Sequence, residues 1–246
     1  MTKLSGIFLF LLLAASVIPS SAQTLTTLYS FCSQTGCTDG SYPDSSLLAA
    51  GDGNLYGMTT AGGNLNSGTI FKITPAGSLT TTYSFCSQPN CIDGSAPSDQ
   101  LVQDADGSIY GATAYGGRHS STGGTIFKTT ASGNLTSLYS FCALPNCADG
   151  SGPDSALVKG SNGSFYGTTF TGGDGFGTVF SITTSGALTT LHTFVNTDGA
   201  GPEALILGAD GNFYGAASTG GAKALFRVTA KVVVLLGLPC SLVSAT

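Results

Sequence analysis

The feature of this sequence that most constrains its fold is a segment of about 54 residues that occurs four times. Aligned on an aromatic-glycine pair, the copies place that pair at Tyr56-Gly57, Tyr110-Gly111, Tyr166-Gly167 and Tyr214-Gly215, at intervals of 54, 56 and 48 residues. Each copy contains four short runs rich in Thr, Tyr, Phe, Ile and Val, bounded by Gly, Asp, Asn and Pro, a pattern typical of strands and turns. In the first copy the predicted strands are 25–31, 46–50, 54–60 and 69–74.

The links between these strands are short turns. Asp-Gly or Asn-Gly stands between the second and third strands of each copy, at 52–53, 106–107, 162–163 and 210–211. Such pairs favour type I′ hairpins, in which both central residues need positive φ. A Gly-Gly pair follows the third strand, and Ala-Gly or Ser-Gly precedes the next unit. Because all three links are of hairpin length, the strands are expected to be sequential antiparallel neighbours.

A repeated four-stranded meander is typical of a propeller blade. We therefore predict an all-β fold over residues 23–230, a β-propeller-like array of four four-stranded antiparallel blades. A β-solenoid is the alternative, although solenoid coils are usually about 20–30 residues long and lack three tight hairpins each. Four blades suffice for the smallest closed propeller. An open fragment of a larger propeller is equally compatible with the repeat.

Both ends of the chain depart from the repeat. Residues 1–22 have the pattern of a signal peptide: Lys3, an apolar run over 7–15, and small residues before an expected cleavage after Ala22. Residues 231–246 are predicted to hold a degenerate closing strand and a tail. The run 232–238 resembles the strand that opens each unit, so it either closes the ring or marks the point where a longer array is cut.

The charge balance restricts the partners. Eight Lys and Arg stand against 13 Asp and Glu, and charged residues make up only 9% of the chain, compared with roughly 25% in an average soluble protein. This balance argues against nucleic acid, whose backbone requires clustered basic residues. No apolar run after the signal peptide is long enough to span a membrane. We therefore expect a secreted or extracytoplasmic protein (periplasm, cell surface or extracellular).

Six of the seven cysteines form three equivalent pairs, and each pair follows a strand of the LYSF type. We predict disulfides Cys32–Cys37, Cys86–Cys91 and Cys142–Cys147. The fourth unit lacks both cysteines of its pair, as joint loss of a bonded pair would produce, and an oxidising compartment favours the bonds. A thiolate metal site is the alternative, weakened by the absence of nearby His. Cys240 has no predicted partner.

The pattern DG-x-IYG-x-T-x-x-GG, followed by GTIFK-x-T and LYSF, resembles the GloVer tandem repeat of secreted and surface-associated bacterial proteins. The resemblance covers roughly residues 25–229. It implies a propeller-like repeat protein that is exported from a bacterial cell. It implies no catalytic residues, and surface anchoring is in question because no sorting signal follows the last unit.

Few residues suggest chemistry. A D-G-x-x-P motif follows each cysteine loop or its counterpart and supplies four equivalent carboxylates, Asp39, Asp93, Asp149 and Asp198. They either line a channel mouth, where they could hold a cation such as calcium, or cap their own turns. The latter is favoured because the motif recurs in every unit. Arg118 and His119, in a widened loop, form a candidate ligand contact, and His192 replaces a tyrosine of the repeat.

The sequence contains no G-x-S-x-G, H-E-x-x-H or phosphate-binding loop motif. We assign no catalytic residue and expect no cofactor beyond the cation considered above. The hypothesis favoured by the periodicity is a non-enzymatic scaffold that binds an extracellular protein or glycan, because fold-specifying residues are the ones that repeat. The alternative is a polysaccharide hydrolase or lyase that uses Asp residues near the propeller channel.

Overall fold

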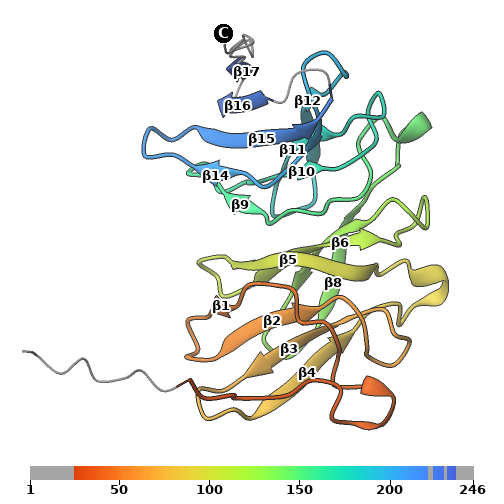
Figure 1. Cartoon of the computed structure of the whole chain (residues 1–246), viewed down its shortest axis with the longest axis vertical. Helices are drawn as coiled ribbons and strands as arrows, with labels where there is room; N and C mark the ends of the chain where they lie inside the picture. The colour runs from red at the N-terminus through yellow and green to blue at the C-terminus, as the bar shows by residue number, and fades with distance from the viewer. Residues whose placement is uncertain (1–24, 221–223, 230–231, 237–246) are drawn as a thin grey trace, which may run out of the picture.

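The computed structural model describes residues 25–220, 224–229 and 232–236, and its regular structure consists of antiparallel sheets joined by short loops (Figure 1). The predicted signal peptide and Cys240 lie outside the described residues. The first sheet contains β1 (Leu48–Ala49), β2 (Leu55–Thr59), β3 (Thr69–Ile73) and β4 (Leu79–Ser84). The second contains β5 (Ser95–Gln103), β6 (Ile109–Tyr115), β7 (Thr125–Thr129) and β8 (Leu135–Ser140).

The third and fourth sheets repeat this order. The third contains β9 (Val158–Lys159), β10 (Phe165–Thr169), β11 (Thr178–Ile182) and β12 (Leu188–Thr193). In the fourth, β13 (Ala200–Pro202) and β14 (Ile206–Leu207) both pair with β15 (Phe213–Thr219), followed by β16 (Ala224–Thr229) and β17 (Val232–Leu236). Three single 3-10 turns lie in the cysteine loops, η1 (Thr35–Cys37), η2 (Pro89–Cys91) and η3 (Pro145–Cys147). The predicted all-β array of four four-stranded antiparallel sheets is therefore confirmed, with β13 and β14 sharing the place of the first strand in the fourth sheet.

The repeated aromatic-glycine pair has a steric cause. Gly57 lies opposite Phe71 in the β2–β3 ladder, and a Cβ at this glycine would lie 2.5 Å from the Phe71 ring. The same clash arises at Gly111 with Phe127 and at Gly167 with Phe180. The glycine thus leaves room for the phenylalanine ring to lie across its own sheet.

The strand grouping differs from the one that the sequence suggested. The LYSF strand that opens each sequence unit pairs with the sheet before it: β4 pairs with β3, β8 with β7 and β12 with β11. The first such segment, 25–31, was predicted as a strand but forms none, because no sheet precedes it within the described residues. At the other end, β17 pairs with β16 and so completes the fourth sheet.

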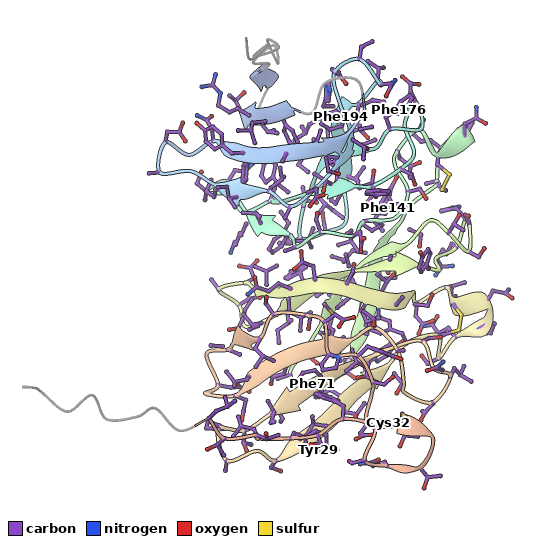
Figure 2. The ribbon with its side chains drawn as sticks, viewed as in Figure 1. Tyr29, Cys32, Phe71, Phe141, Phe176 and Phe194 are labelled. Atoms are coloured by element: carbon purple, nitrogen blue, oxygen red, sulfur yellow. A yellow bond between two sulfur atoms is a disulfide. The ribbon has the colours of Figure 1, made fainter. Side chains whose placement is uncertain are left out.

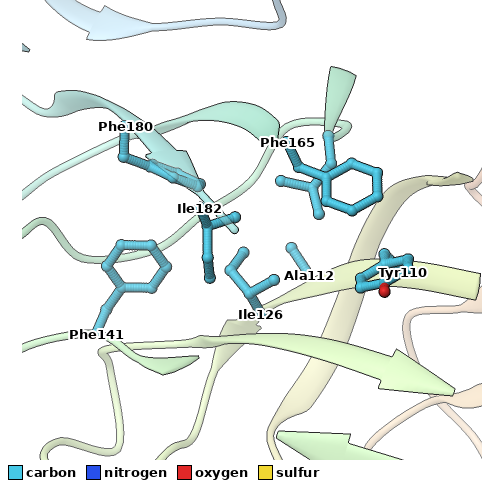
Figure 3. Close-up of a cluster of buried hydrophobic side chains, with 8 residues drawn as sticks. Tyr110, Ala112, Ile126, Phe141, Phe165, Phe180 and Ile182 are labelled. Carbon is cyan, nitrogen blue, oxygen red and sulfur yellow. The ribbon is translucent and has the colours of Figure 1, made fainter. Parts of the chain in front are cut away.

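Hydrophobic clusters lie between successive sheets. We call the side of a sheet that contacts the preceding sheet its upstream face, and the opposite side its downstream face. At the first interface the downstream Tyr56, Met58 and Ile70 pack with the upstream residues Phe85, Leu101, Ile109 and Phe127. Figure 3 shows the second interface, where Tyr110, Ala112 and Ile126 meet Phe141, Phe165, Phe180 and Ile182. A third cluster joins the last two sheets. The repeated residues therefore form the same kind of hydrophobic interface between each pair of neighbouring sheets.

The four sheets form an open array. The first and fourth sheets lie at opposite ends of the longest axis, with the second and third between them (Figure 1). Contacts between neighbouring sheets include those of β5 with β1 and β2, of β10 with β13 and of β9 with β14. The first strands of neighbouring sheets thus lie close together. Of the two arrangements compatible with four units, the described residues adopt the open one.

Candidate functional site

Each aspartate of the D-G-x-x-P motif accepts hydrogen bonds from the loop that it belongs to and from the segment before that loop. Asp39 is buried, and its Oδ2 accepts hydrogen bonds from the Tyr29 hydroxyl at 2.8 Å and from the Ser33 backbone N–H at 3.0 Å. Burial alone would raise the pKa of Asp39, but the hydrogen bonds from Tyr29 and Ser33 outweigh it and lower the pKa to about 2. Asp93 and Asp149 are bonded in the same way by Tyr83 and Tyr139. These carboxylates hold turns together.

The three disulfides Cys32–Cys37, Cys86–Cys91 and Cys142–Cys147 are formed, as predicted. Figure 2 shows Cys32 and its loop near Tyr29, at the outer end of the first sheet. Each bond encloses a 3-10 turn, and both cysteines of each pair have positive φ. Because that conformation is rare for residues other than glycine, the disulfide and the aspartate together hold a tightly bent loop.

The fourth loop has no cysteine, but its aspartate is hydrogen-bonded in a similar way. His192 Nε2 lies 3.1 Å from Asp198 Oδ2, where the other units place a tyrosine hydroxyl. Asp198 Oδ1 accepts the Val195 backbone N–H at 2.9 Å. The substitution at His192 therefore preserves the link between strand and loop.

The remaining sequence-based candidates do not converge on one site. Arg118 and His119 are exposed and border a hollow of about 220 Å³ beside Tyr139. Within the described part of the chain, no group of three or more His, Cys, Asp or Glu side chains is arranged to hold a metal ion. The four motif aspartates do not gather into a ring, because each is bonded within its own loop.

A different set of residues forms a groove across the last three sheets. One hollow of about 210 Å³ is bordered by Asp99, Asp154, Phe170 and Glu203. A second, of about 280 Å³, shares Asp154 and Phe170 with it and extends to Tyr115. We call these five residues and the two hollows the acidic groove. It combines three carboxylates with two aromatic side chains that are 53% (Tyr115) and 50% (Phe170) exposed.

The groove combines repeated and varying positions. Asp154 and Glu203 come directly after the proline of the D-G-x-x-P motif, a position that is also acidic in the first unit (Asp44) and is Ser98 in the second. Phe170 follows β10 at a position that is Thr60, Ala114 or Ser218 in the other units. The strand residues around them repeat closely. The scaffold is therefore constant, while the aromatic residues of the groove change from sheet to sheet.

Hydrogen bonds between sheets fix the groove. Asp99 Oδ2 accepts the Ala156 backbone N–H from the next sheet at 2.9 Å. Ser98 donates to the Pro153 carbonyl at 3.2 Å, and Thr168 donates to the Glu203 carbonyl at 3.0 Å. These bonds cross from one unit to the next. The groove is thus built by the junctions of the sheets and exists only in the assembled array.

The surroundings of Asp154 in the groove change its pKa. Partial burial, followed by the negative charge of Asp99, raises the pKa of the Asp154 carboxyl, and a hydrogen bond with Ser98 opposes the rise. Burial and a neighbouring like charge both disfavour the ionised form. Asp154 therefore retains its proton to a higher pH than an isolated aspartate would.

Sequence reasoning missed these residues. It concentrated on Asp39, Asp93, Asp149 and Asp198 because they recur in every unit. The informative signal was the opposite one: acidic and aromatic residues such as Asp99 and Phe170 at positions where the other units carry small residues. An alignment of the four copies, read for its differences, contains that signal.

Fold and groove together define a β-propeller repeat protein. The family model of the Gloeobacter/Verrucomicrobia repeat matches residues 16–159. The chain belongs to this repeat family, which confirms the resemblance found in the sequence. A comparison with curated proteins found no significant match.

Solved structures with a similar fold include several propellers. The virginiamycin B lyase of Staphylococcus aureus, in a catalytically inactive form with quinupristin, matches with a TM-score of 0.54 at 18% identity, over 80% of this chain and 56% of the lyase. A streptogramin B lyase matches with a TM-score of 0.53 at 18% identity, over 81% of this chain and 57% of its own length. The extracellular domain of a hybrid two-component system from B. thetaiotaomicron gives 0.52 at 12% identity, over 81% of this chain and 23% of that one.

These similarities establish the fold. The chain spans a little over half the length of the two lyases. Among the described residues, none belongs to a helix that is long and apolar enough to cross a membrane.

Proposed function

We propose that this protein is an extracytoplasmic β-propeller scaffold whose acidic groove binds a ligand without converting it. The observation that carries the proposal is that three carboxylates meet two exposed aromatic rings in one groove, and no other unit carries an aromatic residue at either position. Three disulfides in the described residues support an oxidising compartment, as does the predicted signal peptide.

The chemistry of the groove favours a neutral glycan. Carboxylates such as Asp99 and Glu203 accept hydrogen bonds from hydroxyl groups. The exposed rings of Tyr115 and Phe170 offer flat apolar surfaces against which the apolar face of a sugar can pack. The described residues that border the groove include no Lys or Arg, which disfavours an anionic ligand. A polysaccharide segment lying along the groove would contact both kinds of group.

Calorimetric titration of the purified chain against neutral and acidic polysaccharides tests this proposal. We expect binding to a neutral glycan, and a dissociation constant at least tenfold higher, equivalent to about 1.4 kcal/mol, for Phe170→Ala and for Asp154→Asn. Tyr42→Ala is the matched control, because Tyr42 is also an exposed aromatic residue but does not border the groove. Unchanged affinity in both groove variants would contradict the assignment.

Polysaccharide hydrolysis or lysis is the second candidate, and the pair of Asp99 and Asp154 favours it. A carboxyl with a raised pKa beside a second carboxyl is the arrangement from which a general acid and its partner are built. The same glycan panel, analysed for released oligosaccharides, separates the two functions. Turnover that is lost in Asp154→Asn would replace the scaffold proposal with the enzymatic one.

A further inference from the structure

Among the described residues, no sheet packs against the upstream face of the first sheet, whereas its counterparts are each covered by the preceding sheet. Phe31, Leu47, Phe71 and Ile73 border an apolar hollow of about 400 Å³ on this face. Leu47 is 46% exposed, whereas its counterpart Leu101 is 1% exposed because it is covered by the first sheet. An exposed apolar hollow of this kind marks a surface that binds another surface.

The downstream face of the fourth sheet is likewise left uncovered by the described residues, and it carries apolar side chains beside Arg227. It carries Ile206, Tyr214 and Leu225, which correspond in register to Leu48, Tyr56 and Ile70. The three residues of the first sheet belong to or pack against the buried cluster that it forms with the second. By contrast, Ile206 is 67% exposed and Leu225 is similarly exposed.

We propose that a second copy of this chain docks head to tail, with the downstream face of its fourth sheet against the upstream face of the first sheet. The two faces are the halves of an interface that each chain already forms three times internally. They cannot meet within one chain, because they lie at opposite ends of the array (Figure 1). Two arrays joined in this way contain eight sheets, which lies within the typical size range of propellers.

At this junction two segments would compete for the strand position next to the first sheet. Gly77 lies close to the Leu28 carbonyl in the way that Gly133 lies close to the Thr82 carbonyl of β4. Segment 25–30 of one copy and β17 of the other would therefore occupy the same place. The proposal assigns it to β17, because β17 is already paired with β16, whereas 25–28 is exposed and forms no strand. The exposed segment moves aside on docking.

Sedimentation velocity and light scattering of the full chain test the proposal. Wild-type protein is expected to have the mass of at least two chains. Leu47→Asp and Ile206→Asp are each expected to reduce it to one chain, because each places a charge in an apolar interface. An equimolar mixture of the two variants should regain a two-chain species, because each retains the face that the other has lost. Thr27→Pro, in the displaced segment, should leave the mass unchanged.

Leu144→Asp is the matched control, because Leu144 is an exposed apolar residue in a cysteine loop, away from both end faces. Circular dichroism of every variant verifies that it is folded. A folded wild-type chain that stays monomeric at all concentrations overturns the proposal, as it would if further repeats normally cover these faces. Dissociation by Leu47→Asp but not by Ile206→Asp would instead show that the upstream face pairs with itself. Loss of assembly in Thr27→Pro overturns the assignment of β17.

Discussion

The loops that enter the second and the fourth sheets both connect a buried phenylalanine to a hydrogen-bonded aspartate, but they differ in length and in cross-linking. In the second, seven residues lie between Phe85 and Asp93, and the loop contains a disulfide and η2. In the fourth, only three residues lie between Phe194 and Asp198, and this loop has no disulfide and no 3-10 turn. Both phenylalanines are buried, and both aspartates bond the preceding strand and the loop backbone. The carboxylate is thus the shared element, and the disulfide accompanies the longer loop.

The largest expected effect follows from removing that carboxylate. Asp93→Ala removes hydrogen bonds from Tyr83, from the Ser87 N–H and hydroxyl, and from the Gln88 N–H. We expect a loss of about 2–4 kcal/mol in the free energy of unfolding, because buried donors are left unpaired. Asp198→Ala should cost about 1–2 kcal/mol, since fewer bonds are lost at a more exposed site. Urea unfolding measures both.

Asp174→Ala, at an exposed turn residue, is the control for these two variants and should change stability by less than about 0.5 kcal/mol. If Asp93→Ala proves no more harmful than this control, the carboxylate is not the shared element of the loops.

The disulfide should matter less than the aspartate. The double variant Cys86→Ser, Cys91→Ser is expected to lose at most about 2 kcal/mol, because the bond closes a short loop and constrains little of the unfolded chain. Urea unfolding under non-reducing conditions measures the loss, with wild-type protein as the reference. A loss exceeding that of Asp93→Ala would reverse the order of importance derived from the fourth loop.

Acid should weaken the first loop by a smaller amount. The pKa of Asp39 is lowered in the folded state to about 2, below its value in an unfolded chain, so its contribution is complete above about pH 4. As the pH falls from 4 towards 2 the carboxylate is protonated, and about 1–2 kcal/mol of stability is lost. Asp39→Asn should be less stable at neutral pH and show a shallower decline between pH 4 and 2. Parallel declines in the two proteins would contradict the assignment.

Much of the fold was predictable because local chemistry and the repeat indicated the same structure. Asp52-Gly53 and its counterparts specified hairpins, and the cysteine spacing specified disulfides. The membership of the LYSF strand was not predictable in this way. A strand such as β4 is joined to β3 by a tight turn over residues 74–78 and to β5 by the longer loop 85–94, and only the tight turn brings its backbone into a ladder.

The groove could not be read from the repeat because it depends on three sheets at once. Asp99, Asp154 and Glu203 are separated by about fifty residues each, and only the stacking of the sheets brings them to one hollow. No local pattern marks such a site. The differences among copies are the available guide, because strand packing constrains the shared positions and leaves the groove positions free.

The offset between sequence unit and sheet has a consequence for how the array can change its length. Since β4 belongs by sequence to the second unit and by pairing to the first sheet, a duplicated or deleted unit never corresponds to one detached sheet. A duplicated unit enters between two incomplete sheets, and its neighbours on both sides complete it. Every junction then keeps the same apolar pairing, so the array can grow or shrink by whole units without creating a new kind of internal surface.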